Sequence, residues 1–203
     1  MAESPGGYAA AGRAARRAAI VDAATRLLVH EGTAALTTRR VASEVGASTK
    51  VIYTMFGGKA GLVKALYVEG FTRLRQVQDK VVDSGDPVDY LTGLALAYRR
   101  YALREPHYYR VMFERAIPGF VPDGEALAVA ERAAELPLRA IAACVERGVF
   151  AEGEPREIAE LLLAASHGAV SMELAGHFRA GTGAKRYGRL IDAVIVGFSA
   201  DRR

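Results

Sequence analysis

A run of polar side chains between residues 48 and 54 carries the chemistry of a surface that contacts nucleic acid. Hydroxyl and ammonium groups of these sizes reach backbone phosphates and the edges of bases. If a helix begins after Ser48, its first free N–H groups also point toward a phosphate, and the Ser48 hydroxyl can cap them. The polar residues of this segment are Ser48, Thr49, Lys50, Tyr53 and Thr54.

No comparable set of residues indicates an enzyme or a metal centre. The single cysteine, Cys144, has no evident partner, and Glu173 and His177 are spaced as an ordinary surface pair on a helix. The glycine pairs near residues 57 and 182 lack the Gly-Lys-Ser/Thr ending of a phosphate-binding loop. We therefore expect no catalytic residues, no metal and no cofactor.

Positive charge is concentrated in the first third of the chain. Of the 203 residues, the first 60 hold eight basic and four acidic side chains, whereas the rest hold 19 of each, so the formal net charge of +4 lies entirely in the first segment. This asymmetry is typical of a polyanion-binding head on a neutral body, although a solvated basic surface would have the same composition.

Helical spacing of apolar residues extends over almost the whole chain, and strand-like alternation is absent. The pattern predicts an all-α fold of nine helices after a disordered arm at 1–12, with a kink or break at Pro137. The predicted helices span 13–31, 38–45, 49–55, 59–82, 87–104, 106–115, 122–147, 155–179 and 184–200.

The second and third predicted helices have the outline of a helix-turn-helix, with Gly46 in the turn. Thr37 and Ser48 stand at the two N-cap positions. One apolar face on each short helix, completed by leucines of the first helix, would form the core: Leu27, Leu28, Val41, Ala42, Val45, Ile52 and Phe56.

Residues 16–66 resemble the DNA-binding domain of TetR-family transcriptional regulators. The resemblance rests on Arg-Arg-Ala-Ala-Ile at 16–20, Leu-Thr-Thr-Arg-Arg-Val-Ala at 36–42, Gly-Ala-Ser at 46–48, and Ile-Tyr-Thr-Met-Phe at 52–56 followed by Lys59. It implies phosphate contacts by Thr38, Arg39, Tyr53 and Lys59. It also implies base reading by Thr49, Lys50 and Thr54. Lys50 and Met55 replace a frequent glycine and histidine, so a relative's operator cannot be assumed.

The last helix and the one at 155–179 carry apolar residues suited to dimerisation. Three consecutive leucines and several small residues would let helices approach closely, and two such helices from each chain would form a four-helix interface. The alternative is that both stripes pack within one chain. The predicted interface residues are Leu161, Leu162, Leu190, Ile191, Val194 and Phe198.

Aromatic residues of the fifth and sixth helices, together with a mid-helix histidine, predict a small-molecule site, although such a stripe can equally be core. The segments 97–113 and 167–174 resemble the ligand-binding domain of a TetR subgroup marked by Trp-His-Gly, with Ser166 in place of the tryptophan. The predicted ligand-binding residues are Tyr101, Tyr109, Met112, Phe113, His167 and Met172.

Together these features predict a helix-turn-helix DNA-binding domain at 13–58 and a ligand-binding and dimerisation domain at 59–203, joined by the helix at 59–82. We expect a cytoplasmic repressor, associated with the nucleoid when bound to DNA. As a homodimer it would bind an inverted-repeat operator and be released by a small, mostly apolar inducer. The alternatives are an activator or ligand-independent regulator of the same fold, or a helical small-molecule carrier. No apolar run is long enough for a membrane span.

Overall fold

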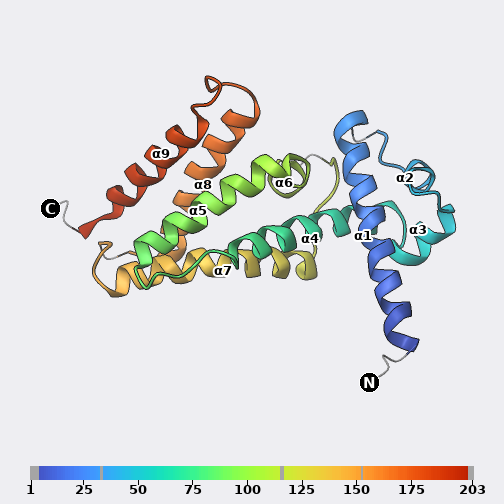
Figure 1. Ribbon diagram of the computed structural model, residues 1–203, viewed down its shortest axis with the longest axis horizontal. Coiled ribbons are helices and arrows are strands. Elements are labelled where there is room, and N and C mark those ends of the chain that lie inside the picture. Colours follow the sequence, from blue (N-terminus) through green and yellow to red (C-terminus); the bar gives the residue numbers. More distant parts are fainter. Residues whose placement is uncertain (1–4, 33, 115–116, 152, 201–203) are drawn as a thin grey trace. The chain divides into compact units, whose positions relative to one another are not determined.

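The computed structural model describes residues 5–32, 34–114, 117–151 and 153–200. Over these residues the chain forms nine α-helices, and its only β-type pairing is a bridge between Phe150 and Ser199, so the predicted all-α class is confirmed. The helices are α1 (Pro5–Glu31), α2 (Thr38–Glu44), α3 (Thr49–Phe56), α4 (Lys59–Gln78), α5 (Pro87–Arg104), α6 (Pro106–Phe113), α7 (Gly124–Glu146), α8 (Pro155–Leu174) and α9 (Gly183–Phe198) (Figure 1).

Helix ends follow the local chemistry, and several differ from the predicted ones. α1 begins at Pro5, so the arm predicted to be disordered is helical from that residue onward, in keeping with its alanine-rich sequence. Residues 1–4 lie outside the described residues. α4 ends at Gln78 rather than near residue 82, and α7 runs through Pro137 without interruption.

α8 ends earlier than predicted because Gly176 adopts a left-handed conformation with φ of 76°. The amide of His177 then bonds the carbonyl of Met172 at 3.0 Å, which closes the last turn. Gly176 therefore terminates the helix.

The chain divides into two compact units. The first contains the residues up to Phe71 together with His107–Ala128, and the second contains Thr72–Pro106 and the chain from Val129 onward. These units do not coincide with the domain ranges predicted from the sequence, because most of α4 and all of α6 except Pro106 are grouped with the helix-turn-helix.

The core of the first unit is built around α1, α2 and α3. The residues predicted to form it are buried, apart from Val45, which is half-buried. α4 starts directly after α3, and a Cβ at Gly61 would overlap the backbone carbonyl oxygen of Phe56, so only glycine fits this junction. Further along α4, a Cβ at Gly70 would lie 2.6 Å from the sulfur of Met112 in α6. These two glycines let α4 pack closely on its neighbours in the unit.

The core of the second unit lies where α5, α8 and α9 pack together. The buried Tyr187 hydroxyl donates a hydrogen bond to the Ala95 carbonyl at 2.9 Å. Arg99 of α5 donates to both carboxylate oxygens of Glu173 in α8, at 2.8 and 2.6 Å. This paired geometry raises the pKa of Arg99, and it fixes α5 against α8.

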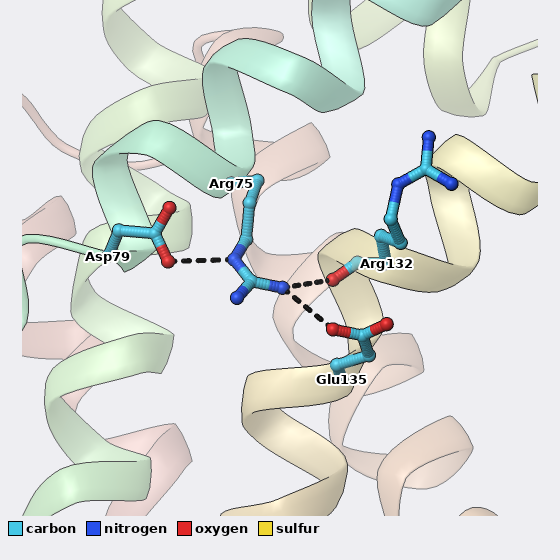
Figure 2. Close-up of polar contacts among 4 residues, drawn as sticks. All are labelled: Arg75, Asp79, Arg132 and Glu135. Atoms are coloured by element: carbon cyan, nitrogen blue, oxygen red, sulfur yellow. Dashed lines mark hydrogen bonds and ion pairs between the residues drawn. The ribbon is translucent and has the colours of Figure 1, made fainter.

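The last part of α4 is tied to α7 within the second unit by Arg75 (Figure 2). Its guanidinium donates to Asp79 at 2.7 Å, to the Arg132 carbonyl at 2.6 Å and to Glu135 at 3.0 Å. Three acceptors on one planar cation hold the helices in a defined register. Among the described residues, no helix is long and apolar enough to cross a bilayer.

Candidate DNA-binding interface

α2 and α3 are joined by a tight turn in which Gly46 has a φ of 63°. Thr37 caps α2 as predicted, because its hydroxyl accepts a hydrogen bond from the Arg40 amide at 3.2 Å. Ser48 occupies the N-cap of α3, but its hydroxyl makes no capping bond, in contrast to the prediction. The Ser48 hydroxyl therefore stays available to a ligand at the start of α3.

The structure brings the predicted DNA-binding residues of α3 onto one exposed face. Ile52 and Phe56 fill the core on the opposite side of the helix, which leaves the polar residues in solvent, and Tyr53 is 58% exposed. Thr38 at the start of α2 is half-buried. The exposed members of the set are Arg39, Ser48, Thr49, Lys50, Tyr53, Thr54 and Lys59.

The turn at Gly57 and Gly58 positions Tyr53 next to the start of α4. Gly57 has a φ of 73°, and its amide bonds the Tyr53 carbonyl at 2.9 Å. Gly58 has a φ of 108°, and a Cβ there would lie 3.2 Å from the Tyr53 ring. Two left-handed glycines thus allow α4 to begin immediately with Lys59, close to the tyrosine.

Ion pairing separates the cations of this surface into two groups. Arg40 pairs with Glu31 at 2.8 Å and with Glu44 at 3.6 Å, and the hydrogen bond between Arg40 and Glu31 lowers the pKa of the carboxyl group. Over the part of the chain that the structure describes, Arg39, Lys50 and Lys59 take part in no ion pair. Their charges are therefore available to phosphates, whereas the charge of Arg40 is neutralised within the unit.

A feature that the sequence analysis did not assign lies between α1 and α3. It is an open groove of about 1150 Å³, whose lining includes Arg13, Arg16 and Arg17 of α1 opposite Ser48, Lys50 and Thr54 of α3. The three arginines had entered the charge count, and their spacing of three and four residues puts them on one side of a helix. That spacing predicts only a shared side of α1, and the contact of Arg17 with Phe56 is what places the arginines beside α3.

The residues predicted to bind a ligand divide between the two units. In the first unit, the Tyr109 and Phe113 rings lie 5.2 Å apart, the Phe113 and Phe71 rings lie 5.5 Å apart, and Met112 is buried beside Gly70. In the second unit Tyr101 is buried and His167 is half-buried. Met172 is 46% exposed on α8.

The predicted dimer residues also differ in exposure. Leu162 and Ile191 are buried in the core of their own chain, so their side chains have no free surface for a partner. Val194 and Phe198 are half-buried, and the Phe198 ring lies 5.9 Å from that of Phe150. Leu190 is half-buried and Leu161 is 51% exposed. The exposed apolar face, here called the α8/α9 face, consists of Leu161, Ala164, Gly168, Met172, Ala193, Val196 and Gly197.

Comparison with known proteins accounts for both parts of the chain. Residues 20–66 match the bacterial regulatory proteins of the tetR family, and residues 91–197 match the tetracyclin repressor-like C-terminal domain. The chain belongs to the TetR family. It is thus a TetR-family transcriptional regulator with a helix-turn-helix DNA-binding domain.

Individual relatives are similar to this TetR-family chain in sequence or in fold. An HTH-type transcriptional regulator of Mycobacterium tuberculosis is 28% identical over 137 residues, which cover 64% of this chain and 58% of the relative. The chain therefore matches less than two thirds of that relative's length. A Rhodococcus protein of unknown function superposes with a TM-score of 0.78 at 22% identity, covering 90% of this chain and 95% of the other. The TetR-family regulator PfmR of Thermus thermophilus gives 0.70 at 20% identity, covering 87% and 97%.

Proposed function

We propose that this TetR-family regulator is a repressor that binds an inverted-repeat operator as a homodimer and is released by a small, mostly apolar inducer. The observation that carries the proposal is the exposed face of α2, α3 and the start of α4, where Arg39, Lys50 and Lys59 have no acidic partner among the described residues. In a two-fold dimer, two α3 helices about 34–36 Å apart would enter successive major grooves of one operator.

The α8/α9 face supports the dimer. Leu161 and Val196 are 51% and 52% exposed, and the exposed parts of the same two helices also carry small residues, which let another helix approach closely. A contiguous apolar surface of this kind marks a protein interface. A second copy fits it best, because the same face on both copies is self-complementary about a two-fold axis.

The position of α6 supports control by a ligand. Its aromatic residues belong to the same compact unit as α1 and α3, and Tyr108 of α6 bonds Asp22 of α1. An apolar ligand that displaced α6 would act on the helices that hold α3. The free energy of that coupling is limited to the difference in the ligand's affinity for the two conformations.

The proposed DNA binding is tested by selecting duplexes from a random-sequence pool with the purified protein. The selected duplexes are then footprinted. We expect an inverted repeat with half-site centres one helical turn apart. Replacing Lys59 by Ala should weaken binding to all duplexes alike and reduce the salt slope by about 0.9 per lost phosphate contact. Lys80→Ala, a change at an exposed lysine of the second unit, is the matched control and should leave the slope unchanged.

The proposed control by a ligand is tested by measuring release of the protein from its operator DNA. Compounds are first screened for release of the wild-type protein, and the best is titrated against His167→Ala and Tyr109→Phe. Loss of one hydrogen-bond partner to a buried ligand should raise the required concentration about tenfold to hundredfold. Release of both variants at the wild-type concentration would place the ligand elsewhere.

The repressor role is separated from the alternative, an activator or ligand-independent regulator, by a reporter gene placed behind the selected operator in cells. Lower expression in the presence of the protein supports repression, and higher expression supports activation. The protein is expected to act in the cytoplasm, where the bacterial DNA lies.

A further inference from the structure

The groove between α1 and α3 is lined by three arginines of α1 that the function proposed above does not use. Arg13, Arg16 and Arg17 lie on the α1 side, and the other side is formed by Ser48, Lys50 and Thr54 of α3. The groove is therefore continuous with the face of α3 that we propose to contact DNA. It is open to solvent and has a volume of about 1150 Å³.

The charges that line this groove have no counterpart of opposite sign. None of its lining residues is acidic, and within the described ranges the three arginines and Lys50 form no ion pair. The acidic residues of α1 are engaged elsewhere, Asp22 with Tyr108 and Glu31 with Arg40. Like charges three and four residues apart on a helix repel each other, so an anion in the groove would relieve a repulsion present in the free protein.

The part of α1 that carries the arginines does not serve the core. From residue 11 onward, the first buried residue of α1 is Ile20, and every residue from 11 to 19 is exposed. Figure 1 shows this N-terminal half of the helix, in dark blue, extending past α3. These nine residues add about 13 Å of helix at 1.5 Å per residue, and their only polar side chains are Arg13, Arg16 and Arg17.

Arg17 places one side of α1 beside α3. Its guanidinium lies 5.3 Å from the centroid of the Phe56 ring, so this side of α1 is held against the end of α3. Arg13 stands one helical turn before Arg17 and therefore projects from the same side of the helix. Arg16 is adjacent, and all three remain exposed.

We infer that the extended N-terminal half of α1 is a second DNA-contacting element. Its arginines bind the backbone phosphates of the duplex next to the bases that α3 reads. Guanidinium groups suit this role because they donate two parallel hydrogen bonds to a phosphate, and a groove flanked by two basic helices accommodates a sugar–phosphate strand. The inference rests on the proposed contact between α3 and DNA, and it adds phosphate contacts without adding base recognition.

The experiment measures affinity for a fluorescein-labelled, mixed-sequence DNA duplex as a function of salt for the wild type and for the double variant Arg13→Ala/Arg16→Ala. Loss of two phosphate contacts in each chain of the proposed homodimer, four in all, should reduce the salt slope by about 3.6. Between about 50 and 200 mM salt, the affinity of the wild-type dimer should then fall roughly 150-fold more than that of the double variant. Alanine favours exposed helix, so circular dichroism should show no loss of helix.

Two control variants distinguish a phosphate contact at Arg13 and Arg16 from a general effect of lowering the net charge. Arg100→Ala/Arg139→Ala removes the same charge from exposed positions of the second unit and should leave the slope at the wild-type value. Arg13→Lys/Arg16→Lys should largely retain the slope. The inference is overturned if the salt slope falls equally in the Arg13→Ala/Arg16→Ala and Arg100→Ala/Arg139→Ala variants, or if it falls in neither. Either result would leave the proposed contact between α3 and DNA in place. A wild type that does not bind the duplex overturns the proposed function itself.

Discussion

The phenolic hydroxyl of Tyr108 donates a hydrogen bond to the Asp22 carboxylate at 2.7 Å, and this bond links α6 to α1 within the first unit. The ring of Tyr108 is buried and Asp22 is half-buried. A hydrogen bond to a charged acceptor in such surroundings contributes more than a neutral one. It attaches a helix of the C-terminal family domain to the first helix of the DNA-binding domain.

Replacing Tyr108 by Phe should lower the free energy of unfolding by about 1–2 kcal/mol, because Asp22 loses a donor in a partly buried site. Urea denaturation measures the change. The matched control is Tyr53→Phe, which removes the same hydroxyl from an exposed tyrosine: it should leave stability unaltered and instead weaken DNA binding. Equal stability of Tyr108→Phe and the wild type would show that the bond contributes nothing to this unit.

Lys50 should determine which bases are preferred. If its ammonium group reads a guanine, Lys50→Ala loses about 1–3 kcal/mol of discrimination at one position of the half-site. A repeat of the duplex selection with the variant detects the change as a relaxed position. A uniform loss across all sequences would instead assign Lys50 to a phosphate.

Exposure on α8 and α9 predicts two different outcomes for charge substitutions. Leu161→Arg and Val196→Arg change the α8/α9 face, so they should give a folded monomer with weakened operator binding. Ile191→Arg puts an unpaired charge into the core of one chain and should abolish folding. Sedimentation velocity and circular dichroism distinguish the results. Intact dimers in both face variants would mean that the chains associate through another surface.

Gly61 and Gly12 should respond to alanine in opposite directions. At Gly61 the new Cβ overlaps the Phe56 carbonyl oxygen, so the junction of α3 and α4 must shift, at a cost of about 1–3 kcal/mol. At Gly12 a Cβ meets nothing within 4 Å on an exposed helix, and alanine should stabilise by about 0.5–1 kcal/mol. Thermal unfolding of the two variants tests the pair. A stabilised Gly61→Ala would show that the junction has free space.

Cys144 is suited to reporting unfolding. Burial in the second unit raises the pKa of its thiol to about 11, so near neutral pH it is protonated as well as inaccessible. We expect no reaction with Ellman's reagent in the folded protein. In denaturant one thiol per chain should react, since the sequence contains a single cysteine. Rapid reaction of the native protein would mean that this part of the core opens readily.

Local sequence determined most of the helices and the exposed polar residues of α3 that we propose to contact DNA. Helix caps act over a few residues, so Thr37, Asp86 and Pro87 are at the predicted starts of α2 and α5. Apolar periodicity likewise separated Ile52 and Phe56 from the exposed polar residues of α3. The reason is that an α-helix has a fixed period of about 3.6 residues per turn, whatever it packs against. Both are properties of neighbouring residues, and both can be read along the chain.

Tertiary structure alone decided which apolar residues of α9 are buried and which charged side chains form ion pairs. Ile191 and Val196 are equally apolar, yet packing against α5 and α8 buries the first and leaves the second exposed. Arg39 and Arg40 are adjacent, yet only Arg40 reaches Glu31. The arginines of α1 became part of a groove because Phe56 holds Arg17 beside α3. These outcomes depend on contacts between residues far apart in the chain, which no local pattern of residue types encodes.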